Sequence, residues 1–207
     1  MKYASRLRAI ISEDAARWRL LLLVRSLCLP DCWVGASFVR NAIWSHLHGR
    51  TAPLLSSDVD VVWFYADRRD ALQDMKIEAA LRGLESSIAW SVKNQARMHG
   101  RSDDAAYVSV RHAMEFWPET ATAVAVRRNE QDDCEIAAPF GLGDLFGLVV
   151  RPTPRFAGAK RRVFEERVRA KRWLEVWPLL RVEGSCDCGH QKAFRPLVRR
   201  WPAQGRP

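Results

Sequence analysis

The chain has 207 residues, of which 48% are hydrophobic and 28% are charged, a length and balance typical of a soluble globular protein with one core. No apolar run approaches the roughly 18 residues that a membrane-spanning helix needs, and the first residues lack the apolar stretch and cleavage site of a signal peptide, so we expect a cytoplasmic protein without a membrane partner. The net charge of +9 favours polyanionic partners such as nucleotides or nucleic acid.

Helical and extended patterns alternate along the chain. Residues 5–27 place apolar side chains at intervals near 3.6 residues, which predicts an amphipathic helix that ends before Pro30. The apolar segment 32–36 predicts a short buried strand, and the β-branched and aromatic segment 58–64 predicts a second strand. Further strands are expected at 88–93, 122–127 and 134–137, and further helices at 38–47, 69–84, 110–117, 141–150 and 159–176. This alternation indicates an α/β or α+β fold in which helices cover a sheet.

The composition changes near residue 183. We expect one domain at 1–182 and a basic, disordered C-terminal tail at 183–207. Cys186, Cys188 and His190 could suggest a metal site, but a structural zinc site needs about four ligands and no second cluster accompanies them. The chain has five cysteines, which we expect to be reduced thiols in a protein without an export signal.

The positive charge is concentrated between Arg151 and Arg172. Nine Lys or Arg residues lie in this stretch against two acidic ones, Glu165 and Glu166. Such a pattern fits either a solvated helix face or a surface that contacts polyphosphate or RNA, and both interpretations stay open.

Two aspartates, Asp58 and Asp60, begin the second predicted strand. Because side chains alternate along a strand, both carboxylates point to the same face, with α-carbons about 6.5–7 Å apart. Two carboxylates on one face repel each other unless a cation lies between them, and magnesium commonly bridges carboxylates to substrate phosphates. The same pattern would also fit a turn residue followed by an exposed strand edge.

A small-residue turn, Gly35-Ala36-Ser37, joins the first predicted strand to a helix. Glycine permits a close backbone approach, serine can cap a helix, and the amides at a helix N-terminus bind phosphate. Such a turn is common by itself. Followed by a strand with Asp58 and Asp60, it predicts a site for phosphates and a metal ion.

The order of these parts resembles the signature of the DNA polymerase β-like nucleotidyltransferase superfamily. The chain is similar to one bacterial family of nucleotidyltransferase-like proteins within it, over about residues 10–180. The resemblance rests on the aspartate strand and on the strings 38–41, 90–99, 117–123, 138–142 and 144–146. It implies a polymerase-β-like fold with a central mixed sheet flanked by helices and a helical C-terminal part. It also implies a nucleoside triphosphate donor and a Mg²⁺ or Mn²⁺ cofactor.

The resemblance also assigns roles. Asp58 and Asp60 would be the metal ligands, and Gly35 and Ser37 would hold the triphosphate. We add four nucleotide contacts from their positions after the turn or at a strand end, where sheet proteins often bind ligands: Arg40, Lys93, Asn94 and Arg97.

One departure from the superfamily pattern matters for activity. Active members usually carry a third acidic residue on a neighbouring strand, and segment 88–94 supplies none. Glu135 is the best candidate for that role, with Asp133 as the second. Two functions therefore stay open: metal-dependent transfer of a nucleoside monophosphate to an acceptor hydroxyl of RNA or another anionic molecule, or a binding module that senses nucleotides without turnover.

Overall fold

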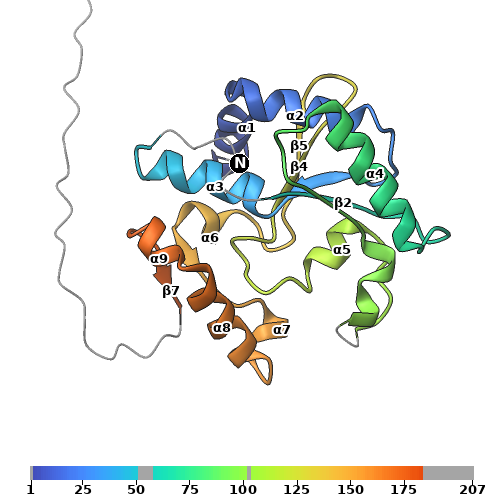
Figure 1. Cartoon of the computed structure of the whole chain (residues 1–207). Coiled ribbons are helices and arrows are strands. Elements are labelled where there is room, and N and C mark those ends of the chain that lie inside the picture. Colours follow the sequence, from blue (N-terminus) through green and yellow to red (C-terminus); the bar gives the residue numbers. More distant parts are fainter. Residues whose placement is uncertain (1, 51–57, 102–103, 184–207) are drawn as a thin grey trace, which may run out of the picture.

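The computed structural model describes residues 2–50, 58–101 and 104–183 (Figure 1). The predicted tail therefore lies outside the described residues except for Glu183, and so do Cys186, Cys188 and His190. Over the described ranges, no helix is long and apolar enough to cross a membrane.

A five-stranded mixed sheet forms the centre of the protein, with the strand order β3-β2-β1-β4-β5. Its strands are β1 (Trp33–Gly35), β2 (Val59–Trp63), β3 (Trp90–Asn94), β4 (Ala125–Arg128) and β5 (Cys134–Ala137). Strands β2 and β3 are parallel, and the other neighbouring pairs are antiparallel. The predicted α/β architecture with a central mixed sheet is confirmed.

Four helices contribute to the core on one face of the sheet. They are α1 (Lys2–Glu13), α2 (Ala15–Arg25), α3 (Ser37–Leu47) and α4 (Ala71–Leu84). Alternate strand residues such as Val34, Val61 and Val92 join these helices in one buried apolar cluster. The single helix expected at 5–27 was wrong: Asp14 interrupts it, and its carboxylate accepts the amide of Arg17 to cap α2.

The opposite face of the sheet is covered in part by α5 (Val110–Met114), on the other side from α4 in Figure 1. Trp33, Val62 and Ala125 pack there with Val110 and Met114 in a second, smaller apolar cluster. Two 3₁₀ turns, Gln95–Arg97 and His99–Arg101, follow β3.

The C-terminal part lies beside the sheet and is helical, as expected (Figure 1). It consists of α6 (Gly143–Phe146), β6 (Val149–Val150), α7 (Pro154–Ala157), α8 (Arg161–Lys171), α9 (Trp173–Val176) and β7 (Arg181–Val182). The helices expected at 141–150 and 159–176 are shorter than predicted. Leu148 has a φ of 56° before β6, and Arg172 has a φ of 50° between α8 and α9, a backbone conformation that cannot continue a right-handed helix.

Candidate nucleotide and metal site

Asp58 and Asp60 lie at the start of β2, which is placed between β3 and the central strand β1. Asp58 is exposed and precedes the strand, whereas Asp60 is half-buried within it. Asp60 lies opposite Gly35 of β1 on one side and opposite Ser91 of β3 on the other. The Ser91 side chain favours the ionised form of the Asp60 carboxyl.

The electrostatics of this pair favour a bound cation. Burial, followed by the charge of Asp58, raises the pKa of Asp60 from 3.8 to about 6, against the opposing effects of Ser91, Lys171 and Arg167. A divalent cation would relieve this repulsion, and two carboxylates are the hard oxygen donors that Mg²⁺ or Mn²⁺ prefers. The described part of the chain has no group of three His, Cys, Asp or Glu residues that could hold a metal, so phosphate oxygens and water would supply the other ligands.

The predicted turn lies directly beside the pair. A Cβ atom at Gly35 would lie 3.2 Å from Cη2 of Trp117 and 3.3 Å from the carbonyl oxygen of Val124, so glycine permits a close approach here. Ala36 has a φ of 51°, and its amide donates to the carbonyl of Val124 over 3.0 Å. This geometry holds the turn against the segment that leads into β4.

Helix α3 starts at this turn and presents its N-terminus to the aspartates. The Ser37 hydroxyl donates to the carbonyl of Asp58 over 2.9 Å, so it joins the turn to β2, a use different from the phosphate contact that we predicted. The Arg40 amide donates to the carbonyl of Ala36, and the amides before it have no acceptor within the helix. Those amides form a natural binding position for an anion.

Arg40 is buried behind the turn. Its guanidinium lies 5.2, 4.7 and 5.7 Å from the ring centres of Trp44, Trp173 and Trp177, and it donates to the side-chain oxygen of Asn41. Burial lowers its pKa to about 10, while the charge of Glu119, and to a lesser extent those of the two aspartates, raise it. The structure therefore places Arg40 inside the protein, where it acts on the site through its electric field.

Three predicted nucleotide contacts, Lys93, Asn94 and Arg97, lie at the end of β3 or in the 3₁₀ turn that follows it, and they divide between the two sides of the sheet. Ser91 is paired with Asp60, so Lys93, two residues later, is on the same face. Asn94 is fully buried on the other face, where its amide oxygen accepts the backbone amides of Tyr65 and Ala96. Arg97 is ion-paired with Asp74 of α4, so the structure brings Lys93 to the side of the aspartates and leaves Asn94 and Arg97 away from it.

Glu135 lies far from the pair. It is on β5, separated from β2 by β1 and β4, and three strand spacings amount to about 14 Å. Its carboxylate accepts hydrogen bonds from Arg127 and Asn129 at 2.7 and 3.0 Å. The expectation that Glu135 joins the aspartates was therefore wrong. Asp133, the alternative, lies in the turn of the same β4–β5 hairpin and is therefore also separated from the aspartates by β1 and β4.

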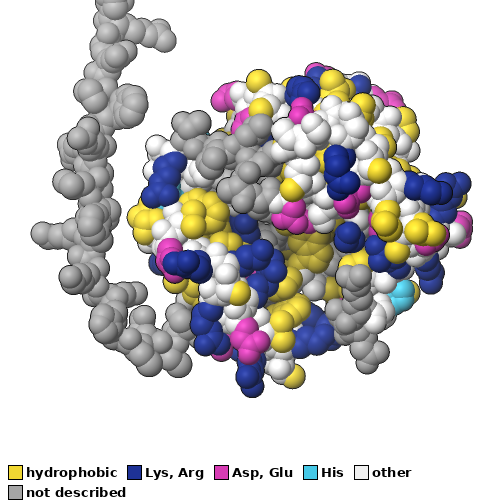
Figure 2. All heavy atoms as spheres, in the orientation of Figure 1, with side chains coloured by type: hydrophobic (Ala, Val, Ile, Leu, Met, Phe, Trp, Pro, Cys, Tyr) yellow, Lys and Arg dark blue, Asp and Glu magenta, His cyan; other side chains and the backbone are white. Residues whose placement is uncertain are grey.

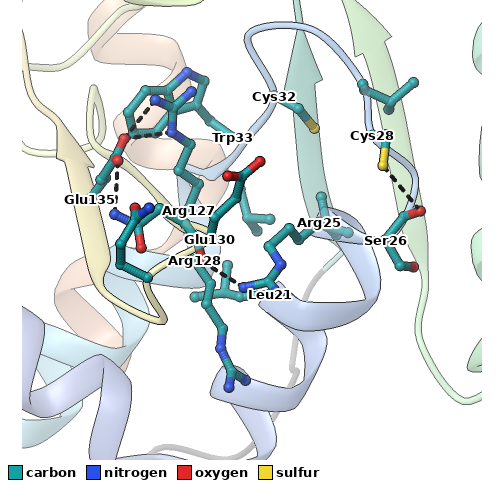
Figure 3. Close-up of a pocket in the computed structure, with 15 residues that line it drawn as sticks. Leu21, Arg25, Ser26, Cys28, Cys32, Trp33, Arg127, Arg128, Glu130 and Glu135 are labelled. Atoms are coloured by element: carbon teal, nitrogen blue, oxygen red, sulfur yellow. Dashed lines mark hydrogen bonds and ion pairs between the residues drawn. The ribbon is translucent and has the colours of Figure 1, made fainter.

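Glu135 lines a cavity of about 690 Å³ between the end of α2 and the β4–β5 hairpin (Figure 3). Figure 3 shows Glu135 directed toward Arg127, with Arg25 and Cys28 on the side of α2. Neither aspartate lines this cavity, so we separate it from the candidate site.

The part of the chain around the aspartates also contains groups that the sequence did not single out. Ser91 and the two α8 residues Arg167 and Lys171 act on the charge of Asp60. Figure 2 shows a hollow in this face of the molecule, with acidic side chains near the start of β2 and Lys and Arg side chains across from them over α8. Arg167 and Lys171 were part of the basic stretch, but only the position of α8 reveals which of its cations face the site.

Comparison with known proteins agrees with this geometry. Residues 23–182 match a protein family described as nucleotidyltransferase. The chain belongs to this nucleotidyltransferase family. Among curated proteins, none matches the sequence.

Solved structures similar to this chain also share its fold. A protein whose NMR structure reveals a CCA-adding enzyme head domain is 33% identical, with a TM-score of 0.79 over 87% of this chain and 96% of that one. The Thermotoga maritima CCA-adding enzyme complexed with tRNA is 16% identical, with a TM-score of 0.53 over 87% of this chain and 42% of that one. A CCA-adding enzyme solved with CTP is 16% identical, with a TM-score of 0.55 over 86% of this chain and 43% of that one. The chain thus corresponds to less than half of these longer enzymes and to nearly all of the isolated head domain.

Proposed function

We propose that this protein transfers a nucleoside monophosphate from a nucleoside triphosphate to an acceptor hydroxyl, with Asp58 and Asp60 holding Mg²⁺ or Mn²⁺. The observation that carries the proposal is the position of the half-buried Asp60, between Gly35 of the turn and Ser91 of β3. This position brings two carboxylates next to the N-terminus of α3 in a nucleotidyltransferase fold.

The transfer would be an in-line displacement at the α-phosphorus. The acceptor oxygen forms a bond to phosphorus, the bond from phosphorus to the oxygen that bridges to the β-phosphate breaks, and pyrophosphate leaves with the electron pair. The acceptor proton passes to water. A bound divalent cation would supply neutralisation of the phosphate charge, while the amides of α3 and the cation Lys93 would orient the phosphates.

In a second candidate function, the protein binds the same nucleotide and metal but does not catalyse the transfer. Ser91 is the β3 residue next to Asp60, and it supplies a hydroxyl donor where an acidic residue would supply a metal ligand. A site with two carboxylates can bind a metal and a nucleotide without activating the acceptor hydroxyl. Under this alternative, the protein would act as a nucleotide sensor or as a regulator of a partner.

RNA is the first acceptor class to test. The net charge of +9 favours a polyanion, and a structural neighbour was solved in a complex with tRNA. Small anionic metabolites and proteins carry hydroxyls as well and belong in the same assay.

The decisive experiment supplies each α-labelled nucleoside triphosphate with Mg²⁺ or Mn²⁺ to the purified protein together with cellular RNA, protein or small metabolites. An Asp58→Asn/Asp60→Asn double variant is assayed in parallel. Label that enters one acceptor class only with the intact aspartates would establish the transferase and identify that class. Metal-dependent binding of nucleotide without any transfer would favour the sensor.

A further inference from the structure

Helix α8 carries two kinds of cations. Arg161 and Arg162 form ion pairs with the glutamates four residues later, Glu165 and Glu166. Just beyond the helix, Arg172 pairs in the same way with Glu175. Arg162 and Arg172 are exposed and Arg161 is half-buried, and the charges of all three are matched by adjacent carboxylates, so they leave little free charge for a polyanion.

Arg167 is different because its partner comes from another part of the fold. Its Nε donates to Glu119 over 2.7 Å, and the Glu119 side chain is fully buried. The other carboxylate oxygen of Glu119 accepts the Thr122 hydroxyl over 2.7 Å. Glu119 belongs to the segment that continues into β4, the strand next to Gly35. The side chain of Arg167 is therefore fixed at one nitrogen yet keeps 38% of its surface exposed.

Lys171 lies one helical turn after Arg167, and side chains four residues apart share a side of a helix. It forms no ion pair within the described ranges, and it is exposed. The two cations therefore form a short row along α8, with the anchored Arg167 at one position and the unpaired Lys171 at the next.

Lys and Arg side chains over α8 form the basic edge of the hollow, across from the start of β2 (Figure 2), and the charges of Arg167 and Lys171 act on Asp60. Behind it, Trp173 contacts both Arg167 and the buried Arg40, at 5.9 and 4.7 Å from the ring centre. Arg167 and Arg40 both act on one buried carboxylate, Glu119, and the unpaired Lys171 adds a third cation, so the edge keeps an excess of positive charge. A ligand that binds to both the acidic and the basic edge of the hollow must carry negative charge for α8 and must also bind the cation held by the aspartates.

We propose that Arg167 and Lys171 bind the β- and γ-phosphates of the nucleotide across the hollow from Asp58 and Asp60, and that they retain the pyrophosphate formed there. The identity of the ligand as a nucleoside triphosphate rests on the function proposed above. The contrast between Arg167, which is anchored on Glu119 of another segment, and Arg161 and Arg162, which pair with glutamates of their own helix, rests on the geometry alone.

The test measures binding of inorganic pyrophosphate, in the presence of Mg²⁺, to the full chain by calorimetry. An Arg167→Met/Lys171→Met variant, the inner variant, removes both charges and keeps the aliphatic stems. The matched control, Arg162→Met/Arg169→Met, removes two cations from the exposed face of the same helix. Thermal unfolding identifies any variant that fails to fold, and single Arg167→Lys and Lys171→Met variants, which disturb packing less, then provide the measurement.

We expect the inner double variant to bind pyrophosphate about 30-fold or more weakly, which corresponds to at least ~2 kcal/mol, and the control to bind within about twofold of the parent. With a triphosphate that transfers label, the inner variant should show a raised KM for the nucleotide and a smaller change in kcat. A folded inner variant that binds pyrophosphate as tightly as the parent would overturn the assignment. So would equal weakening in the control.

The outcomes separate this inference from the proposed function. Loss of pyrophosphate binding in the inner variant, combined with a parent that transfers no label, would support the phosphate assignment and count against the transferase. Normal pyrophosphate binding in the inner variant, combined with label transfer by the parent, would support the transferase and overturn the phosphate assignment. A parent that binds no pyrophosphate in the presence of Mg²⁺ would overturn the assignment directly.

Discussion

Ser91 lies directly opposite Asp60 in the parallel pair of β2 and β3, and its side chain lowers the pKa of the Asp60 carboxyl. This is the position from which β3 could bring a third acidic side chain to the aspartates, because paired residues on neighbouring strands point to the same face about 5 Å apart. Serine there stabilises the ionised form of Asp60 without adding a ligand. The chain therefore has a site with two carboxylates, and the neighbouring strand β3 contributes a hydroxyl beside Asp60 instead of a third carboxylate.

Ser91→Asp should convert this arrangement into a three-carboxylate site. Without metal, the added charge should lower the melting temperature, because three carboxylates would then repel one another. With Mg²⁺, Ser91→Asp should have the higher melting temperature of the two proteins. It should bind Mg²⁺ about tenfold more tightly than the parent does, because the cation gains a ligand. Calorimetric titration with Mg²⁺ and thermal unfolding measure both effects. Ser91→Asn, which has similar size and no charge, should show neither, and a Ser91→Asp protein with unchanged Mg²⁺ affinity would count against a metal site here.

Asp60→Asn should stabilise the protein at neutral pH. The pKa of Asp60 is about 6 in the folded protein against a usual 3.8, so between these values the folded state holds more protons than the unfolded state. The free energy of unfolding should therefore fall as the pH rises from about 4 to 6 and then level off. The difference in pKa sets an upper limit of roughly 3 kcal/mol for the gain in Asp60→Asn at pH 7.5.

Urea unfolding of the parent and of Asp60→Asn across pH 4–8 measures this difference. Their stabilities should converge toward pH 4, and Mg²⁺ should stabilise the parent alone. Asp67→Asn, at an exposed position after β2, is the control and should follow the parent throughout. An Asp60→Asn protein that is less stable than the parent at pH 7.5 would show that Asp60 is not under electrostatic strain.

The sequence was sufficient to predict which segments of the chain form the five strands of the central sheet, and to predict that Asp58 lies close enough to Asp60 for their charges to interact. Both follow from local rules: the intervals of apolar residues, and the alternation of side chains along a strand. We predicted both Lys93 and Asn94 as nucleotide contacts, although alternation alone would have separated them, since consecutive residues of β3 point to opposite faces. The polar string after β3 suggested a shared role, whereas its members belong to different faces of the sheet.

Strand order and register could not be predicted from local patterns. Glu135 is separated from β2 by β1 and β4 because the chain returns to the sheet on the far side of β1, a fact that no periodicity in the segment 134–137 contains. The role of Arg167 depends in the same way on Glu119, which is 48 residues earlier in the chain. Groups that meet through tertiary packing require the structure, whereas groups on one strand require only the sequence.

Gly35→Ala should disturb both stability and the site. The new Cβ would lie 3.2 Å from the Trp117 ring and 3.3 Å from the backbone oxygen of Val124, so the turn must move by a few tenths of an ångström. We expect a loss of about 1–3 kcal/mol in the free energy of unfolding, with weaker pyrophosphate binding in the folded protein. Gly83→Ala is the matched control: it lies in α4, where an added Cβ meets nothing within 4 Å.

Chemical unfolding should show a lower free energy of unfolding than in the parent for Gly35→Ala alone. Alanine favours a helix over glycine by roughly 0.5–1 kcal/mol, so Gly83→Ala should be neutral or slightly more stable. A Gly35→Ala protein with the stability and pyrophosphate affinity of the parent would show that the turn does not need the close approach of Trp117.

Arg97→Met tests whether the end of β3 binds the nucleotide or supports the fold. Arg97 is ion-paired with Asp74, whose side chain is only 3% exposed and also accepts hydrogen bonds from the Trp63 indole and the Asn94 amide. Loss of the cation leaves a buried carboxylate without its counter-charge, which should cost about 3–5 kcal/mol. Because the pair lies on the face away from Asp60, the folded variant should bind pyrophosphate within about twofold of the parent.

Arg82→Met is the control for this last prediction. Arg82 forms an exposed ion pair with Glu78 on the same helix as Asp74, and its loss should change stability by less than about 0.5 kcal/mol. Urea unfolding gives the stabilities, and titration at a temperature where both variants are folded gives the affinities. If Arg97→Met kept the stability of the parent and lost affinity for pyrophosphate, Arg97 would be a phosphate contact as its position in the sequence suggested. The opposite result would assign it, with Asn94 and Asp74, to the support of the sheet behind the site.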